Sequence, residues 1–290
     1  MLLSILIPTH NRDCSQLVQE LLSELPEDAE IIIGNDKSTD KDTIAACQLM
    51  AGWKHCRVYE PQENLGRSRI RNRLMQLSTG KWLLFMDADT KPTSPLFIRN
   101  YLEAAEQHPA DIYFGGMVNT KECPNGCELR WTYESRHSAR HTVEYRQTHP
   151  YSSMTTQNCM ISRQALSQSP FTEEITGYGY EDTILFDSLM RKGKRAWHID
   201  NPLIHLDIDT NEHFLAKTRE ALRTLHSLPI EIRPDIPIVR MYNSLQRRHL
   251  YRLLALVHLI LLPITRRILC SRFVSIKLLQ FYKLGYLCSL

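Results

Sequence analysis

The first half of the chain alternates short apolar segments with amphipathic ones. Apolar, β-rich segments occupy residues 2–8, 29–36, 56–61, 81–89 and 110–117. Between them the spacing is helical: Ile70, Leu74 and Leu77 recur at i, i+4 and i+7, with the arginines of that stretch on other faces. Strands alternating with helices predict a mostly parallel sheet flanked by helices, and continuously apolar strands indicate a sheet that is covered on both faces.

The second half is less regular. Residues 155–166 predict a strand that enters a helix, and residues 194–209 predict one or two short strands. Residues 176–193 predict a glycine-rich loop and then a helix that ends at Gly193. In that helix we expect four residues to face the core, namely Ile184, Leu185, Ser188 and Leu189.

Polar residues follow three of the predicted strands. Residues 9–12 (Thr-His-Asn-Arg) follow the first strand, Asn35 and Asp36 follow the second, and Asp87 and Asp89 follow the fourth. Ligands of open α/β sheets bind at the carboxyl ends of the strands. We therefore expect these three clusters to converge on one edge of the sheet and to form a site.

Composition and charge refine this interpretation. The 290 residues are 43% hydrophobic and 23% charged, as in a globular protein. Residues 229–290 hold ten Lys and Arg against two acids, whereas the remainder holds 25 against 30. No acidic residue follows Asp235, so the C-terminal segment is expected to have an anionic partner. The apolar N-terminus lacks a basic region and is interrupted by Pro8 and Asn11, which predicts a strand rather than a signal peptide.

The eight cysteines are scattered, which indicates a reducing compartment rather than a disulfide framework. Cys123 and Cys127 form the only close pair. A zinc site usually has a second pair, so we interpret these two as loop cysteines.

Asp87-Ala88-Asp89 directly follows an apolar strand. Two carboxylates at such a position offer hard oxygen ligands for Mn²⁺ or Mg²⁺. The alternative is a polar turn whose aspartates cap the next helix. Asp36 also has two interpretations: it accepts a hydrogen bond from a ligand, or it caps the helix that includes residues 43–50, for which Asp40 is better placed.

Two further stretches carry candidate chemistry. Residues 63–72 place Asn64 and Gly66 before a helix with several arginines, and such a helix start attracts phosphate unless the basic face is merely solvated. In "GYGYED", the glycines allow positive φ, and Glu181 and Asp182 either present a general base or only suit the helix N-terminus. His198 and His205 are either structural or metal ligands.

The ordered motifs "ILIPTHNR", "IIIGNDKSTD", "ENLGRSRIRN", "WLLFMDADT" and "GYGYED" resemble the family 2 glycosyltransferases of the GT-A fold, over roughly residues 1–210. The resemblance implies an α/β, Rossmann-like, mostly parallel sheet flanked by helices. We expect a catalytic domain over residues 1–228, with a donor half of about 1–117 and an acceptor half of about 118–228. A basic, apolar helical region would follow at residues 229–290.

The resemblance also implies roles for single residues. Asp36 would read the nucleobase, Asp87 and Asp89 would hold Mn²⁺ or Mg²⁺ against the donor diphosphate, and Asp182 beside Glu181 would be the catalytic base. His205, rather than His198, would complete the metal shell. The expected nucleotide-sugar-binding residues are Thr9, Asn11, Arg12, Asp36, Asn64, Gly66, Arg71, Asn72, Asp87 and Ala88.

The implied reaction moves one sugar from a UDP- or dTDP-linked donor to a glycan or lipid-linked acceptor, with inversion, in cell-surface polysaccharide or glycolipid assembly. Lys37 replaces a glycine of the family pattern, which leaves the nucleotide open. No Gln-x-x-Arg-Trp motif and no series of membrane spans is present, which disfavours polymer synthesis. The alternatives are a nucleotidyltransferase, although "IPTHNRDCS" lacks the expected glycine, and a non-catalytic nucleotide- or glycan-binding protein. We expect no nucleic-acid partner.

The C-terminal region predicts membrane contact. Only 13 residues separate Arg252 from Arg266, about 20 Å of helix, which is too short to span a bilayer, and Pro263 is expected to kink or break that helix. Residues 266–287 interleave basic and bulky apolar residues, as in a helix lying on an anionic membrane. We expect a cytoplasmic protein, peripheral at the inner face through residues 250–290. The alternatives are a helical appendage packed on its own domain, and a partner or dimer contact.

Overall fold

The computed structural model describes residues 2–140, 142–175 and 177–290, and the side chains of residues 137–140 are not described. The chain forms two compact units that interleave along the sequence. Unit 1 contains Met1–Asn119, Ser138–Glu173 and Glu181–Asp207, and unit 2 contains Thr120–His137, Glu174–Tyr180 and Ile208–Leu290. These units are defined by contacts within the chain, not by function. The predicted boundary between a catalytic domain and a C-terminal region at residue 228 therefore stays a prediction.

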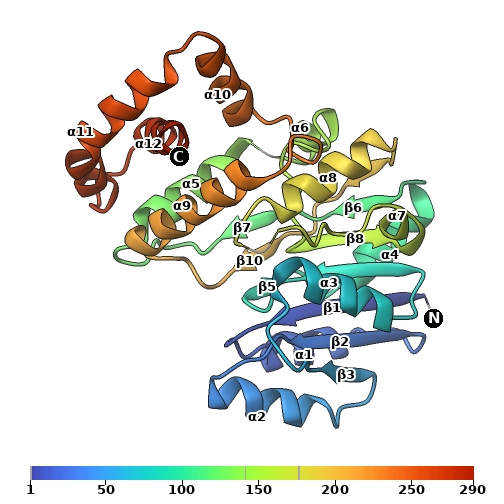
Figure 1. Cartoon of the computed structure of the whole chain (residues 1–290). Coiled ribbons are helices and arrows are strands. Elements are labelled where there is room, and N and C mark those ends of the chain that lie inside the picture. Colours follow the sequence, from blue (N-terminus) through green and yellow to red (C-terminus); the bar gives the residue numbers. More distant parts are fainter. Residues whose placement is uncertain (1, 141, 176) are drawn as a thin grey trace. The chain divides into compact units, whose positions relative to one another are not determined.

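Unit 1 is built on a seven-stranded sheet with the order β3-β2-β1-β4-β8-β6-β9 (Figure 1). Every neighbouring pair is parallel except those made by β8, which runs antiparallel to β4 and β6. The predicted mostly parallel sheet is therefore confirmed. The strands are β1 (Leu3–Thr9), β2 (Ala29–Asn35), β3 (Cys56–Tyr59), β4 (Trp82–Met86), β6 (Ile112–Phe114), β8 (Asn158–Ser162) and β9 (Ala196–His198).

Helices cover both faces of this sheet, as its apolar strands predict. Ile5 and Ile7 of β1 pack in one buried cluster with residues of α1, α2 and α4, whereas Leu6 packs in a second cluster with residues of α3, α7 and α8. Successive side chains of a strand point to opposite faces, so a strand buried on both sides has no polar alternation. The helices of unit 1 are α1 (Ser15–Leu22), α2 (Lys41–Met50), α3 (Gly66–Leu77), α4 (Phe97–Gln107), α6 (Val143–Thr148), α7 (Arg163–Gln168) and α8 (Glu181–Arg191).

The single strand predicted over residues 110–117 is wrong. β6 ends at Phe114, and β7 (Met117–Asn119) belongs to a separate sheet with the order β5-β10-β7, in which β5 is Thr90–Pro92 and β10 is Leu203–His205. Gly115 and Gly116 make the break. A Cβ atom on Gly115 would lie 2.3 Å from the Asn201 carbonyl oxygen, and Gly116 has a φ of +87°. Only glycine tolerates this close approach followed by this backbone conformation.

Helix α8 largely matches its prediction. Ile184, Leu185 and Leu189 are buried, and Gly193 follows the helix with a φ of +67°. Ser188 is half-buried, and its hydroxyl forms a hydrogen bond with the hydroxyl of Ser169. Phe186, which the helical spacing did not single out, is also buried.

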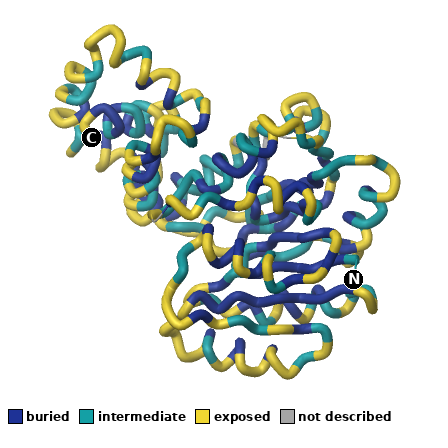
Figure 2. Tube along the Cα trace, turned by 45° about the vertical axis from the view of Figure 1, so that its right-hand side comes forward, coloured by how far each residue is buried: buried dark blue, intermediate teal, exposed yellow. Residues whose placement is uncertain are grey.

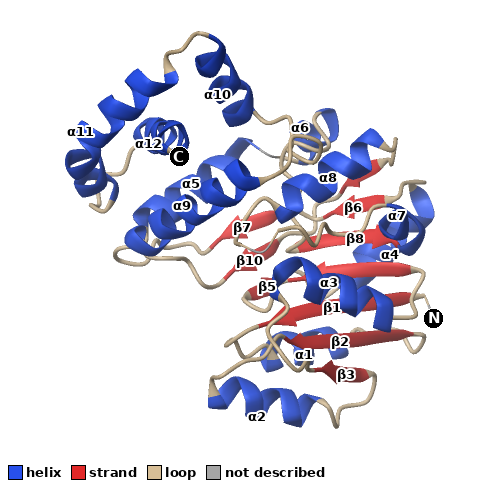
Figure 3. Cartoon of the chain, in the orientation of Figure 1, coloured by secondary structure: helices blue, strands red, loops and turns tan. Residues whose placement is uncertain are grey.

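Unit 2 is helical (Figure 3). Its core contains Leu129, Phe214, Leu215, Leu269, Leu279 and Tyr282. The eight cysteines of the chain are free thiols. The helices are the larger part of α5 (Glu128–Arg140), α9 (Asn211–Ser227), α10 (Pro237–Arg247), α11 (Tyr251–Leu269) and α12 (Ile276–Ser289).

Pro263 does not break α11, because the helix continues to Leu269, and a kink at this position stays a prediction. Both Pro263 and Leu259 are exposed. The Leu259 carbonyl loses its helical partner at Pro263, and this exposure gives it access to water. Across residues 2–140, 142–175 and 177–290, no helix combines the length and the apolar character that crossing a bilayer requires.

Candidate active site

The polar residues after β1, β2 and β4 lie at one edge of the sheet. The parallel register pairs Thr9 with Asn35, so the two strands end level with each other, and the Asp36 amide donates to the Thr9 carbonyl at 2.8 Å. β4 pairs with the other side of β1 in the same direction. The predicted convergence of the strand ends is therefore confirmed, at the point where the strand order reverses.

Asp36 holds the start of α3. Its two carboxylate oxygens accept hydrogen bonds from the backbone amides of Leu65 at 2.7 Å and Gly66 at 2.9 Å. Its carbonyl accepts from the Asn64 side chain at 2.7 Å. The expected alternative, a cap for the helix of residues 43–50, is wrong for Asp36, because Asp40 accepts from the Thr43 amide and caps α2. The first amides of α3 are thus engaged by a carboxylate of the chain itself.

Asn11 joins the loops that follow β1 and β2. Its side-chain oxygen accepts from the amides of Thr39 at 2.7 Å and Asp40 at 3.0 Å, and its own amide donates to Ser38 Oγ at 2.8 Å. Asn11 has a φ of 54°, which asparagine tolerates better than most residues. Thr9 is buried and donates its hydroxyl to the Arg12 carbonyl. These contacts shape the rim of the site, and donor binding by these residues stays a prediction.

Arg71 and Asp87 form the best-defined ion pair of the site. Arg71 Nη2 lies 2.7 Å from Asp87 Oδ1, and Arg71 is only 3% exposed. The prediction that the arginines of this helix avoid the core is therefore wrong for Arg71. Asp87 offsets the charge that would otherwise be buried alone, which is the usual condition for a buried guanidinium.

Asn72, which is expected to line the donor site, makes contacts within the fold, and its role in donor binding stays a prediction. It is buried, and its amide group donates to the Phe171 carbonyl at 2.9 Å and to Glu173 Oε1 at 2.8 Å. Its oxygen accepts from the Phe171 amide at 3.0 Å. Asn72 therefore fastens α3 to residues 171–173.

Asp89 and His205 meet at 3.3 Å, between Asp89 Oδ2 and His205 Nε2. The antiparallel pairing of β10 with β5 sets Thr90 opposite His205 and so brings the histidine to the aspartate. Burial acts to raise the pKa of Asp89, but the hydrogen bond and charge of His205, together with a backbone hydrogen bond and the charge of Arg12, lower that pKa below its ordinary value. His198 lies elsewhere, with its Nε2 at 2.9 Å from the Pro150 carbonyl.

Few protein side chains are placed to bind a divalent cation at this site. Within the described part of the chain, no group of three or more His, Cys, Asp or Glu residues is arranged to hold a metal ion. Asp89 offers a carboxylate, the ligand type that suits Mn²⁺ and Mg²⁺, and His205 adds one imidazole nitrogen. Divalent cations at phosphate sites commonly take one or two carboxylates and complete their shell with water and substrate oxygens. The pair is compatible with that mode.

Asp182 is held by one residue that the sequence analysis missed. The Thr156 hydroxyl and amide donate to the two carboxylate oxygens of Asp182. Burial, followed by the nearby charge of Glu181, raises the pKa of Asp182 to about 6, against the lowering effect of Arg71 and of the Thr156 hydrogen bond. Glu181 is buried, and its Oε1 lies 3.2 Å from Arg67 Nη1.

The direction of β8 explains why Thr156 was missed. β8 is antiparallel to β4 and pairs Asn158 with Met86. Residues that precede β8 therefore lie beside residues that follow β4, at the edge where Asp87 lies. The sequence could have placed Thr156 at this edge only if β8 had been predicted to be antiparallel to its neighbours.

The glycines of the "GYGYED" stretch are explained by packing within unit 2. A Cβ atom on Gly179 would lie 2.5 Å from the Ala221 Cβ atom, and one on Gly177 would lie 2.6 Å from Thr224 Oγ1. Gly179 also has a φ of +97°. Thr176, the first residue of the predicted loop, lies outside the described residues.

Residues 4–169 match the sequence pattern of the family described as Glycosyl transferase family 2. The chain belongs to this family. The curated relatives of this family 2 glycosyltransferase include YibD of Escherichia coli K12, described as an uncharacterized glycosyltransferase. It is 37% identical over 89 residues, which are 30% of this chain and 26% of the relative. The poly(ribitol-phosphate) beta-glucosyltransferase of Bacillus spizizenii is 31% identical over 133 residues, 43% of this chain and 20% of the relative. The match therefore spans about a quarter or less of these two relatives.

Solved structures share the fold of the family 2 glycosyltransferase. Residues 1–349 of S. aureus TarS align with a TM-score of 0.54 and 17% identity, over 79% of this chain and 67% of that chain. The mannosyltransferase PcManGT from Pyrobaculum calidifontis, in complex with GDP-Man and Mn²⁺, aligns with a TM-score of 0.55 and 15% identity, over 77% of this chain and 62% of that chain. The predicted GT-A architecture with a C-terminal helical region is confirmed.

Proposed function

We propose that this chain transfers one sugar from a nucleotide-sugar donor to an acceptor hydroxyl with inversion at the anomeric carbon. The observation that carries the proposal is the carboxylate of Asp182. It is fixed by Thr156, its pKa is raised to about 6, and it is close enough to Asp87 and Arg71 to sense their charges. Family membership supports glycosyl transfer over nucleotidyl transfer and over binding alone.

Asp182 acts as the general base in this proposal. A base is most effective when its pKa lies near the working pH, because it is then ionised and still attracts a proton. With a pKa of about 6, Asp182 is mostly ionised at neutral pH. It takes the proton of the acceptor hydroxyl while that oxygen attacks the anomeric carbon, and a single displacement inverts the configuration there.

Asp87, Asp89 and His205 form the diphosphate side of the site. Asp89 and His205 would hold Mn²⁺ or Mg²⁺, with Asp87 beside them. When bound, the cation supplies Lewis-acid stabilisation of the leaving nucleoside diphosphate. Arg71 neutralises Asp87 in this structure, so Asp87 would contribute to a bound cation only in competition with the Arg71 guanidinium.

The similar solved structures indicate only the chemical class of the donor, a nucleotide sugar. Structures of TarS hold UDP-GlcNAc and UDP, and that of PcManGT holds GDP-Man. We propose a UDP- or dTDP-linked donor, read in part by Asp36, and a glycan or lipid-linked acceptor in cell-surface polymer assembly. We also propose that the enzyme acts in the cytoplasm, peripheral to the membrane.

The test is a panel of nucleotide sugars with Mn²⁺, each scored for slow hydrolysis and for protection of the protein against heating. One donor class is expected to score in both assays. Asp182→Asn should keep the heat protection and lose the hydrolysis, which separates catalysis from binding. If no nucleotide sugar protects the protein at any metal concentration, sugar transfer by this site is refuted.

A further inference from the structure

Helix α11 presents a continuous apolar face to solvent. Leu253, Leu256, Ile260 and Ile264 follow one another at helical spacing and are 58%, 55%, 66% and 60% exposed. Leu259 is 56% exposed beside them. Exposed stretches are plain along the C-terminal part of the trace, near the end marked C (Figure 2). Single exposed leucines are ordinary on a protein surface, whereas three turns of Leu and Ile on one helix face mark an interaction surface.

The opposite face of α11 is committed to packing in unit 2. His258, Thr265 and Leu269 are buried, and a Cβ atom on Gly285 of α12 would lie 2.6 Å from the His258 Cβ atom. This close approach of α11 and α12 fixes the rotation of α11 about its axis. The apolar face consequently cannot turn inward without breaking the core of unit 2.

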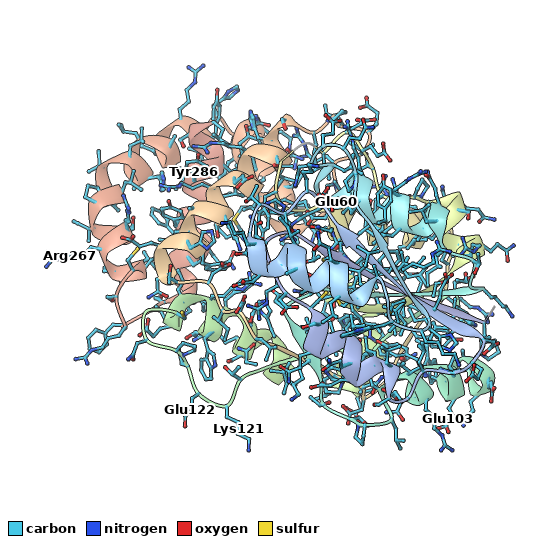
Figure 4. The ribbon with its side chains drawn as sticks, turned by 90° about the horizontal axis from the view of Figure 1, so that it is seen from below. Glu60, Glu103, Lys121, Glu122, Arg267 and Tyr286 are labelled. Carbon is cyan, nitrogen blue, oxygen red and sulfur yellow. The ribbon has the colours of Figure 1, made fainter. Side chains whose placement is uncertain are left out.

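The charged residues of α11 itself have one sign, and the acidic residue paired with them is Glu212 of α9, whose Oε1 lies 3.9 Å from Arg266 Nη2. No Asp or Glu follows Asp235, whereas nine Lys and Arg do. Arg252 lies at the start of α11, and Arg266 and Arg267 lie in its last turn, all three exposed. The Arg267 side chain extends away from the ribbon (Figure 4).

We propose that the exposed face of α11 docks on an anionic lipid surface, with the helix lying in the plane of the membrane. A helix of 19 residues is about 28 Å long. Its arginines sit at both ends, so a flat orientation lets them reach lipid phosphates while the leucines enter the acyl boundary. A symmetric contact between the α11 faces of two copies fits less well, because it would set their arginines against one another.

This assignment changes the expected lipid-facing segment. The interleaved basic and apolar pattern that favoured residues 266–287 lies largely on α12, but Leu279, Tyr282 and Leu287 are buried. The packed appendage, which was the alternative interpretation, therefore describes α12. Membrane contact by α11 rests on the peripheral location proposed above, but it requires no donor, acceptor or catalysis, so its failure would leave the proposed sugar transfer intact.

The experiment is co-sedimentation of the full chain with vesicles of phosphatidylcholine, with and without phosphatidylglycerol, at low salt and at about 1 M salt, where the Debye length is about 3 Å. Truncation is unsuitable because Leu269, Leu279 and Tyr282 belong to the core of unit 2. Binding is expected only with phosphatidylglycerol and only at low salt.

Two sets of substitutions test the two parts of the surface. Leu256→Gln, Ile260→Gln and Ile264→Gln together should weaken vesicle binding at least about tenfold, and Arg252→Gln, Arg266→Gln and Arg267→Gln should do the same. The matched apolar control is Leu49→Gln, Leu96→Gln and Ile230→Gln, which removes three other exposed apolar side chains. The matched charge control is Lys54→Gln, Arg99→Gln and Arg191→Gln. Both controls should bind as the unchanged chain does.

Circular dichroism establishes that each variant is folded. The proposal is overturned if the full chain stays in the supernatant with anionic vesicles at low salt, or if the α11 variants bind as their controls do. It is equally overturned if analytical ultracentrifugation shows a dimer that only the α11 apolar variant dissociates, while vesicles bind nothing, because the face then belongs to a second copy.

Discussion

The Thr156 hydroxyl donates to Oδ1 of Asp182 at 2.6 Å, and the Thr156 backbone amide donates to Oδ2 at 3.2 Å. A single buried residue therefore holds both oxygens of the proposed base. Because the side chain and the amide approach different oxygens, the carboxylate plane is fixed as well as its position.

Thr156→Val should lower kcat about 10- to 100-fold with little change in the KM for the donor. A hydrogen bond to a charged group contributes about 1.5–3 kcal/mol, and this one also lowers the pKa of Asp182. The acidic limb of the kcat–pH profile should accordingly move to higher pH, and Thr156→Ser should restore it.

Thr155→Val is the matched control, because the Thr155 hydroxyl is buried and has no hydrogen-bond partner among the described residues. A profile that moves equally in both variants would mean that Thr156 matters only for packing.

Asp182→Asn should reduce kcat by about 10²–10⁴, the usual contribution of a positioned general base, while calorimetric donor affinity stays near that of the unchanged protein. In the unchanged protein, kcat should rise with pH through about 6, where Asp182 loses its proton. Near-normal turnover by Asp182→Asn would remove Asp182 from the mechanism, and Glu181→Gln would be measured next.

The same substitution should stabilise the fold at neutral pH. The pKa of Asp182 is about 6 in the folded protein and near 3.8 in the unfolded chain, so the folded state binds the proton more tightly. The free energy of unfolding therefore falls as pH rises between these values, and the ionised carboxylate is a cost above pH 6. Asp182→Asn removes that cost and should raise Tm by a few degrees at pH 7.5 but hardly at pH 4. Thermal melts at the two pH values measure this, and equal shifts would contradict the raised pKa.

Asp89→Ala should abolish Mn²⁺-dependent binding of UDP or dTDP while leaving the protein folded. Asp89 supplies the carboxylate of the pair with His205, and the imidazole alone is a weak site for a hard cation. Isothermal titration with and without Mn²⁺ measures the change. Glu103→Ala, an exposed carboxylate paired with Arg99 on α4, is the control. Unchanged metal-dependent affinity in Asp89→Ala would show that the cation is held elsewhere.

Asp36→Ala should cost about 1–3 kcal/mol of stability in urea unfolding, because two amides at the start of α3 lose their acceptor. Asp40→Ala, which uncaps α2, should cost about 1 kcal/mol and leave donor binding unchanged. A combined loss of stability and nucleotide affinity in Asp36→Ala alone would fit a carboxylate that both holds α3 and reads the base. A loss below about 0.5 kcal/mol would contradict the capping role.

The sequence by itself determined the architecture and the edge at which the site lies. Strands that are apolar on both faces, alternating with helices, predict a covered parallel sheet from local periodicity alone. Because Asp36, Asp87 and Asp89 directly follow their strands, their common edge follows from the parallel direction of those strands. The helix of Asp182 was equally readable, since Gly193 marks its end.

Only the tertiary structure decided which polar groups are partners. The Arg71–Asp87 pair and the Thr156–Asp182 pair join residues 16 and 26 positions apart, and the second depends on β8 running against β4. Likewise, α11 and α12 have similar basic and apolar composition, yet α11 leaves one apolar face exposed, whereas Leu279, Tyr282 and Leu287 of α12 are buried. Composition gives each helix its apolar surface, but how much of that surface the core of unit 2 covers depends on which helix packs against α9, and that helix is α12. This packing depends on side chains far apart in the sequence, so no local periodicity predicts it.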